Sequence, residues 1–228
     1  MLKGPILARK PADQSVSPEE IVRAAADVLR EHGYDATTMK DIASRVNLTA
    51  ASLYHHFKSK DFLLLAVLEL GLEQAIAKVE PIAADPNMSH TDKLRAMIHT
   101  HVLEVTTNTA IGAAMVFEIK SLLNANFGPR GSSANDKASK EEFFQRRDNF
   151  FQRRASFERQ FRKVIEEGMA AGAFRQVDAA IVAKAMLGAH NWVGVWFKPN
   201  GRLSGEQVAE IMSDTFLVSL TAVKEELA

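Results

Sequence analysis

Phenylalanines and arginines are interleaved between residues 143 and 161, where their side chains could together bind an anion that carries an apolar group. A helix turns about 100° per residue, so four of the phenylalanines fall within about 40° of one another. They are Phe143, Phe150, Phe157 and Phe161. Arg147 and Arg154 project onto the same stripe. Because a buried charge is costly unless it is paired, these arginines either meet a carboxylate of a neighbouring helix, meet the anion of a ligand, or lie exposed at the stripe's edge.

Motifs for catalysis and metal binding are missing from the sequence. It has no HExxH, GxGxxG, P-loop or Gly-x-Ser-x-Gly pattern and no carboxylate pair in a supporting context. His55 and His56 point about 100° apart on a helix, and His99 and His101 do not face each other either, so neither pair favours a metal. There is no cysteine. We therefore expect no enzyme activity, no metal and no cofactor, and keep a helical enzyme as a distant alternative.

Residues 15–60 have the pattern of three helices. Ser17 is an N-cap before Pro18, and Gly33 is a stop signal for the first helix. Thr37 or Thr38 caps a short second helix, and a tight turn follows at Asn47. Two short helices joined by a turn and braced by a longer helix form a helix-turn-helix.

The third of these helices, residues 50–56, is poor in packing residues. Leu53 is its clear apolar residue, and most of the others are small or polar. That composition suits a recognition helix, which lies in the major groove of DNA and reads bases with its N-terminal residues. Lys58 and Lys60 follow it directly and are predicted to contact phosphates, which position a protein on DNA without reading sequence.

This stretch resembles the N-terminal DNA-binding domain of the TetR/AcrR family of bacterial repressors. The run LYHHFKSK fits the family's most specific signature, LY-x-HF-x-x-K, and Asn47 stands where the family usually has Gly. The resemblance implies that the threonines at the second helix bind a phosphate, with capping alone as the alternative. The predicted DNA contacts are Thr37, Thr38, Thr49, Ala50, Ala51, Ser52, Tyr54, His55, Lys58 and Lys60.

The net charge of the chain is zero, and residues 1–60 hold nine Lys/Arg against seven Asp/Glu, a balance of +2. A surplus this small indicates that DNA binding depends on local placement and on two copies acting together. We expect a homodimer on a palindromic double-stranded operator. The sequence has no membrane-length apolar run, so we expect a cytoplasmic protein without a membrane partner.

The sequence predicts an all-α fold of about nine helices. Residues 1–14 form a flexible arm, residues 15–60 the DNA-binding domain, and residues 61–228 a helical domain for ligand binding and dimerisation. Pro81 and Pro86 are expected to end a long helix that starts near Lys60. The resemblance implies that this helix joins the two domains. Small residues at 112–114 allow close helix packing or leave room for a ligand.

The segment from Gly172 to Ser204 resembles the branch of the family that controls fatty-acid or steroid breakdown, whose members respond to acyl-CoA thioesters. The resemblance makes an acyl-CoA the expected small-molecule effector, with Arg147 and Arg154 on its phosphates. A TetR-like efflux regulator that senses apolar drugs is the alternative. The predicted ligand-binding residues are Arg147, Phe150, Arg154, Phe157, Asn191 and Trp192.

The last two helices, near residues 178–197 and 205–226, are rich in small and aromatic residues. Such helices suit a self-complementary interface between two copies of the chain, and they also suit an intrachain core. Both hold if the pair packs against its twin as a four-helix bundle. The predicted interface residues are Gly188, Ala189, Val193, Trp196 and Phe216.

Overall fold

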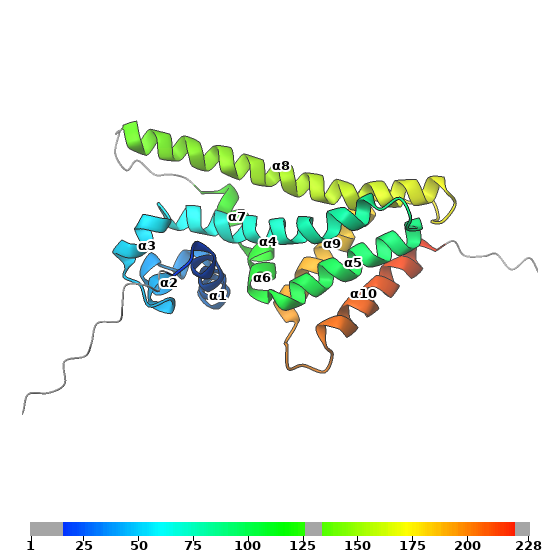
Figure 1. Ribbon diagram of the computed structural model, residues 1–228, viewed down its shortest axis with the longest axis horizontal. Coiled ribbons are helices and arrows are strands. Elements are labelled where there is room, and N and C mark those ends of the chain that lie inside the picture. Colours follow the sequence, from blue (N-terminus) through cyan, green and yellow to red (C-terminus); the bar gives the residue numbers. More distant parts are fainter. Residues whose placement is uncertain (1–15, 126–133, 222–228) are drawn as a thin grey trace, which may run out of the picture.

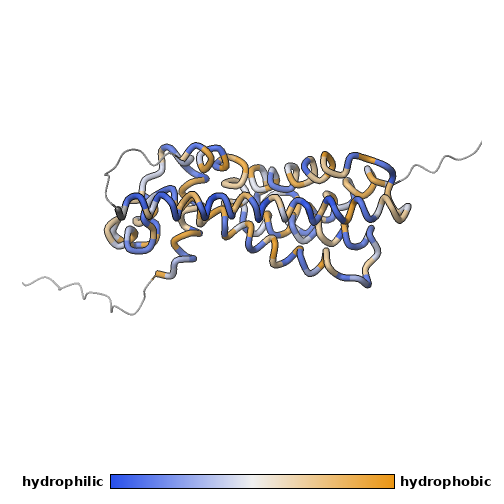
Figure 2. Tube along the Cα trace, turned by 90° about the horizontal axis from the view of Figure 1, so that it is seen from above, coloured by the Kyte–Doolittle hydropathy of each residue, from blue (hydrophilic) through white to orange (hydrophobic). Residues whose placement is uncertain are grey.

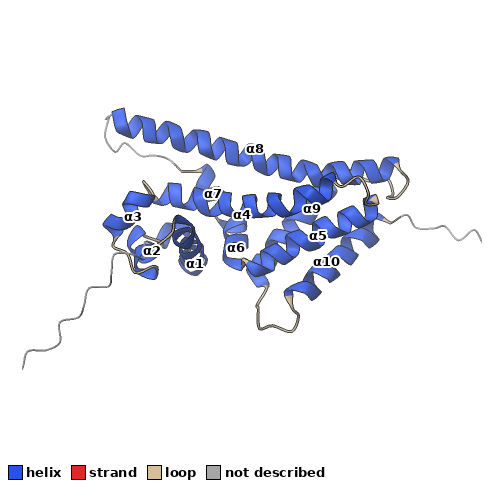
Figure 3. Ribbon diagram, viewed as in Figure 1, coloured by secondary structure: helices blue, strands red, loops and turns tan. Residues whose placement is uncertain are grey.

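The computed structural model describes residues 16–125 and 134–221, and within these ranges every regular element is a helix (Figures 1 and 3). The expected flexible arm lies outside the described residues. There are ten helices in the described ranges rather than nine, because residues 109–123 divide at Glu118 into two. They are α1 (Pro18–Ala36), α2 (Met39–Arg45), α3 (Ala50–His56), α4 (Lys60–Ala84), α5 (His90–Thr107), α6 (Thr109–Phe117), α7 (Ile119–Leu123), α8 (Ala134–Ala170), α9 (Ala179–Trp196) and α10 (Gly205–Leu220).

Helix starts follow the capping residues that the sequence predicted. The Ser17 side chain accepts a hydrogen bond from the backbone of Glu20, and Thr38 does the same for Asp41. Thr49 caps α3 and Ser204 caps α10 in the same way. Side-chain acceptors at these positions satisfy backbone N–H groups that have no partner inside the helix.

Two expected helix ends differ in the structure. Gly33 has a φ of 74° and kinks α1, but helical structure resumes and continues to Ala36. Pro81 lies inside the last turns of α4, which ends at Ala84 rather than before the proline. The turn at Asn47 is as predicted, since its φ of 57° lies in the left-handed region that Asn tolerates.

The helices form a small head at one end and a larger bundle at the other (Figure 1). Helices α1–α3 make the head, α4 leads from it into the bundle, and α8 lies along α4. Seen from above, α8 is largely hydrophilic along its outer side (Figure 2). Within the described part of the chain, every helix is too short or too polar to span a lipid bilayer.

The phenylalanine stripe of α8 is core, as its spacing predicts. The four stripe residues, Phe143, Phe150, Phe157 and Phe161, are all at most 5% exposed. Phe143 packs edge-on against Phe62 of α4, with ring centroids 5.4 Å apart. Ion pairs of Arg146 with Glu69 and of Arg153 with Glu73 run beside this contact and join α8 to α4.

Helices α6 and α9 touch backbone to backbone. A Cβ atom added at Gly194 would lie 2.9 Å from backbone carbons of Gly112, a distance that real side chains do not show. The small residues near position 112 therefore serve close helix packing. They serve the ligand alternative as well, because Gly112 also lines the cavity described below.

Candidate DNA-reading head and effector cavity

The recognition helix α3 buries one residue and leaves the others partly or fully exposed. Leu53 is completely buried, whereas Tyr54 is 53% exposed and both histidines are exposed. The Thr49 hydroxyl lies 2.9 Å from that of Ser52, so the start of the helix carries a small polar surface. This arrangement leaves the residues predicted to reach DNA at the surface of the head, with the exceptions that follow.

Thr37 is one exception, because it is only 1% exposed. Its hydroxyl donates a 2.7 Å hydrogen bond to the carbonyl oxygen of Gly33, inside the head. A phosphate contact by this side chain was therefore a wrong prediction, and its role is to hold the end of α1. Thr38 is exposed and caps α2, so its predicted DNA contact stays a prediction.

The two lysines after α3 also have partners within the chain. The Lys60 ammonium donates to the carbonyl oxygens of Tyr34 and Thr37, at 2.6 and 2.9 Å, and so closes the C-terminal end of α1. Lys58 pairs with Glu142 near the start of α8. Lys60 is thus a structural residue of the head, while exposed Lys58 can still turn toward a phosphate.

A cavity of about 280 Å³ lies in the larger bundle, between α4, α5, α6, α8 and α9. Part of its wall is apolar and comes from Leu72, Ala75, Val105, Ile111, Met115, Phe157 and Leu187. The other part is polar or charged and comes from Gln74, His101, Glu104, Asn108, Arg154, Glu158, Lys184 and Asn191. Buried Gln74 Oε1 has no hydrogen-bond partner in the structure. Such a wall suits a ligand with an apolar body and a few polar groups.

The two stripe arginines have different surroundings. Arg154 lines the cavity, its side chain also reaches solvent, and it forms no ion pair with any described residue. Arg147 lies away from the cavity, 4.7 Å above the ring of Phe144, and pairs with the adjacent Asp148. Arg154 can therefore still bind an anionic group of a ligand. The prediction that Arg147 belongs to the ligand-binding residues was wrong, because it does not line the cavity.

Among the other predicted ligand contacts, Phe157 and Asn191 line the cavity. Phe150 is 1% exposed and belongs to the core beside it, and Trp192 is 49% exposed on the outer surface, against Phe117. Neither lines the cavity, so these two predictions were wrong. Glu104 and Asn108, which do line it, carried no sequence signal that separates them from ordinary helix-surface residues.

Two histidines from α5 and α9 meet at the cavity wall, to which His101 belongs. The Nδ1 atoms of His101 and His190 are 3.1 Å apart, and both side chains are buried. Burial lowers the pKa of His101 to about 4 and that of His190 well below its ordinary value. Both rings are therefore neutral near pH 7, one Nδ1 donating and the other accepting. In the described ranges, no group of three or more His, Asp or Glu side chains could hold a metal ion.

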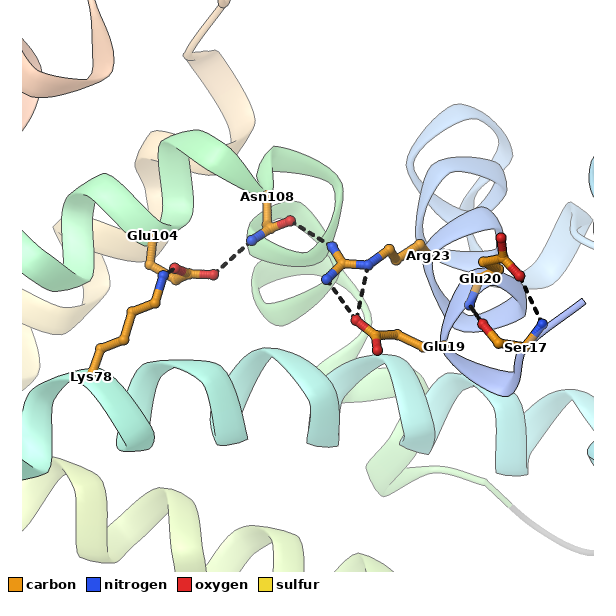
Figure 4. Close-up of polar contacts among 7 residues, drawn as sticks. All are labelled: Ser17, Glu19, Glu20, Arg23, Lys78, Glu104 and Asn108. Carbon is orange, nitrogen blue, oxygen red and sulfur yellow. Dashed lines mark hydrogen bonds and ion pairs between the residues drawn. The ribbon is translucent and has the colours of Figure 1, made fainter.

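A chain of polar contacts leads from the cavity to the head (Figure 4). Glu104 accepts a hydrogen bond of 2.6 Å from the Asn108 side-chain amide, and it also pairs with Lys78 of α4. The Asn108 oxygen accepts one of 3.0 Å from Arg23 of α1, which also pairs with Glu19. The Asn108 amide thus links the cavity wall to α1 of the DNA-reading head.

The predicted dimer residues are not all on the surface. Val193 is fully buried within its own chain, and Phe216 is half-buried against His190, so for these two the intrachain alternative holds. Gly188 and Trp196 are exposed, and Ala189 is half-buried. The large exposed apolar side chains of α9 and α10 are Ile181, Trp192, Trp196, Ile211 and Val218.

The N-terminal and C-terminal parts of the chain each match a known protein family. Residues 21–67 match the family described as "Bacterial regulatory proteins, tetR family". Residues 143–220 match "Tetracyclin repressor-like, C-terminal domain". The first match covers the head and the start of α4, and the second covers most of α8 together with α9 and α10.

Individual proteins resemble the chain over most of its length. The HTH-type transcriptional repressor KstR2 of Mycolicibacterium smegmatis is 27% identical over 202 residues, 88% of each chain. The solved PfmR regulator of Thermus thermophilus is 29% identical, with a TM-score of 0.70, covering 87% of this chain and 97% of its own. AibR, solved with isovaleryl coenzyme A and operator DNA, is 24% identical with a TM-score of 0.68, covering 90% and 97%, and shares the fold.

Proposed function

Because this chain belongs to the TetR family of bacterial regulatory proteins, we propose that it is a transcriptional repressor that a small molecule releases from its operator. The curated relatives are transcriptional regulators rather than enzymes. The exposed polar surface of α3 supports DNA binding, and the cavity in the bundle supports an effector. The proposed effector is an acyl-CoA.

The observation that carries the acyl-CoA is Arg154, a cation without an ion-pair partner among the described residues, beside an apolar wall. The cavity, about 280 Å³, holds about nine waters' share of liquid volume. An acyl group fits that space, while the nucleotide of CoA stays outside near Arg154 and Lys184. Guanidinium groups match phosphate oxygens, and each buried CH₂ contributes about 0.8 kcal/mol. The related AibR was solved with an acyl-CoA.

Calorimetry with octanoyl-CoA, palmitoyl-CoA and a ring-containing acyl-CoA tests the effector, with free CoA as the control. We expect at least one thioester to bind and to release the operator. Arg154→Met should weaken that binding by about tenfold, or ~1.4 kcal/mol, with little change in operator affinity. Arg147→Met is the matched control, because Arg147 lies outside the cavity.

The apolar-drug alternative predicts the opposite pattern. If no acyl-CoA binds and hydrophobic cations do, or if Arg154→Met responds like the parent, the effector is not an acyl-CoA. The DNA-binding part is tested separately by selecting duplexes from a random pool and footprinting them. A homodimer should protect a pseudo-palindrome whose half-sites are about 34–36 Å apart or a multiple of that spacing.

The exposed apolar side chains of α9 and α10 support the homodimer. Two tryptophans about half exposed on one helix, with Ile211 and Val218 exposed on the next, are unusual on a monomer surface. A second copy would cover them and pair the two heads for two half-sites. Trp196 was among the predicted interface residues and stays in the proposal, whereas Val193 lies in the chain's own core.

A further inference from the structure

We propose that Asn108 is the residue through which the effector cavity acts on the DNA-reading head, an inference that rests on the proposed function of the cavity. Asn108 lines the cavity and also binds Arg23 of α1. Its side-chain amide nitrogen donates a 2.6 Å hydrogen bond to a carboxylate oxygen of Glu104, another cavity residue. A change at Glu104 therefore reaches α1 through two hydrogen bonds (Figure 4).

The position of Asn108 in the fold favours this role. It ends α5 and precedes α6, where an Asn would ordinarily cap the new helix with its side chain. No such cap is formed, because the side chain is turned to Glu104 and Arg23 instead. The Asn108 side chain therefore does not stabilise the start of α6, and instead connects Glu104 of the cavity wall to Arg23 of α1.

Helix α1 holds both ends of α6. Arg30, one heptad after Arg23, donates to the Thr109 hydroxyl at 3.4 Å, and the Tyr34 backbone N–H donates to Glu118 at 3.1 Å. Between these points, Ile111, Gly112 and Met115 of α6 face the cavity. Helix α1 thus makes three contacts here, with Asn108, Thr109 and Glu118. Of these three residues, Asn108 lines the cavity, so a ligand can touch it directly.

The chemistry of the contact indicates what a ligand must offer. Glu104 accepts and the Asn108 amide nitrogen donates, so a ligand group that both donates and accepts hydrogen bonds can take the place of either partner. Secondary amides and hydroxyl groups do this, and CoA thioesters carry amides in the arm next to the acyl group. A purely apolar ligand cannot, although it would fill the same cavity.

The test weakens the contact with the cavity partner without touching α1, because Gln at position 104 keeps an acceptor oxygen but loses the carboxylate charge that strengthens the hydrogen bond from Asn108. Glu104→Gln should raise hydrogen exchange of α1 amides and change affinity for a selected operator by about fivefold, the lower end of ordinary coupling between sites. Both effects should vanish in an Asn108→Leu background. Glu158→Gln is the matched control, since Glu158 lines the same cavity but pairs with Lys184 of α9.

Several results would overturn the proposal. Glu104→Gln could leave α1 exchange unchanged, or Glu158→Gln could act equally well. The effect of Glu104→Gln on α1 could also persist in the Asn108→Leu background. It would then be transmitted through the ion pair of Glu104 with Lys78 of α4. Arg23→Met, which breaks the contact from the side of the head, guards against misfolding of the Asn108 variant and should also abolish the Glu104→Gln effect.

The exchange measurement needs neither operator nor effector. If the protein binds no acyl-CoA, the proposed effector fails, while α1 exchange still decides on Asn108. Where an acyl-CoA does bind, Arg23→Met, a change outside the cavity, should leave its calorimetric affinity within about threefold but reduce its ability to release DNA. By reciprocity, the operator should then weaken acyl-CoA binding less than in the parent.

Discussion

At the scale of residues, lysines and arginines of similar sequence context have different roles. Lys60 was predicted to contact a DNA phosphate, and its ammonium instead donates to carbonyl oxygens at the end of α1. Arg147 and Arg154 have the same spacing from the phenylalanines, yet only Arg154 lines the cavity. The partners come from distant parts of the chain, and they decide what each cation does.

Lys60→Met should lower the free energy of unfolding by about 2 kcal/mol, because charged groups in hydrogen bonds contribute about that much. Urea denaturation measures it. Lys58→Met is the matched control and should cost at most about 1 kcal/mol, since its ion pair with Glu142 is exposed. Equal stability of the two variants would show that Lys60 is not a structural cap.

At the scale of elements, the sequence predicted where helices start better than which of their faces is buried. Ser17 and Thr38 cap helices as predicted, because a cap depends on neighbours three residues away. Val193 was assigned to the dimer face and lies in its own core. An apolar helix face in a sequence does not show whether its partner is the same chain or a second copy.

The contact between α6 and α9 gives a prediction about helix packing. Gly194→Ala should lower the unfolding free energy by about 2 kcal/mol, because its Cβ would overlap the backbone of Gly112. Gly188→Ala, on the same helix with open space around it, should be neutral or stabilise by up to about 1 kcal/mol. Thermal melts of both variants compare them, and a tolerated Ala at 194 would contradict the close contact.

At the scale of the whole molecule, contacts between distant segments make the site. His101 and His190 are 89 positions apart in the chain and 3.1 Å apart in space, and no sequence pattern links them. The same holds for Arg23 and Asn108, 85 positions apart. The three-helix head and the phenylalanine stripe were predictable from periodicity, whereas the cavity wall assembled from five helices was not.

The histidine pair makes stability depend on pH. The folded-state pKa of His101 is about 4, below the unfolded value near 6.5, so the unfolded state takes up protons first. Stability is therefore full above about pH 6.5 and falls as the pH drops toward 4. At about pH 5 the loss from His101 is roughly 2 kcal/mol, and His190 adds to it. The variant His190→Phe should melt with a shallower pH dependence than the parent.

The dimer face can be separated from the core by two substitutions on α9. Trp196→Glu changes an exposed side chain and should give a folded monomer in sedimentation, with weaker operator binding. Val193→Glu buries an unpaired charge in the chain's own core and should abolish folding instead. A dimeric Trp196→Glu protein would place the interface elsewhere.

The mixed wall of the cavity also bears on the use of this protein as a biosensor. Leu72, Met115 and Leu187 contribute apolar surface to it, and a library that varies them would recruit new inducers. Glu104 and Asn108 face the same space but are joined to α1, so varying them would alter the output as well as the input. A screen that keeps these two residues fixed would change which ligands induce the protein, while the ratio of induced to uninduced expression would stay the same.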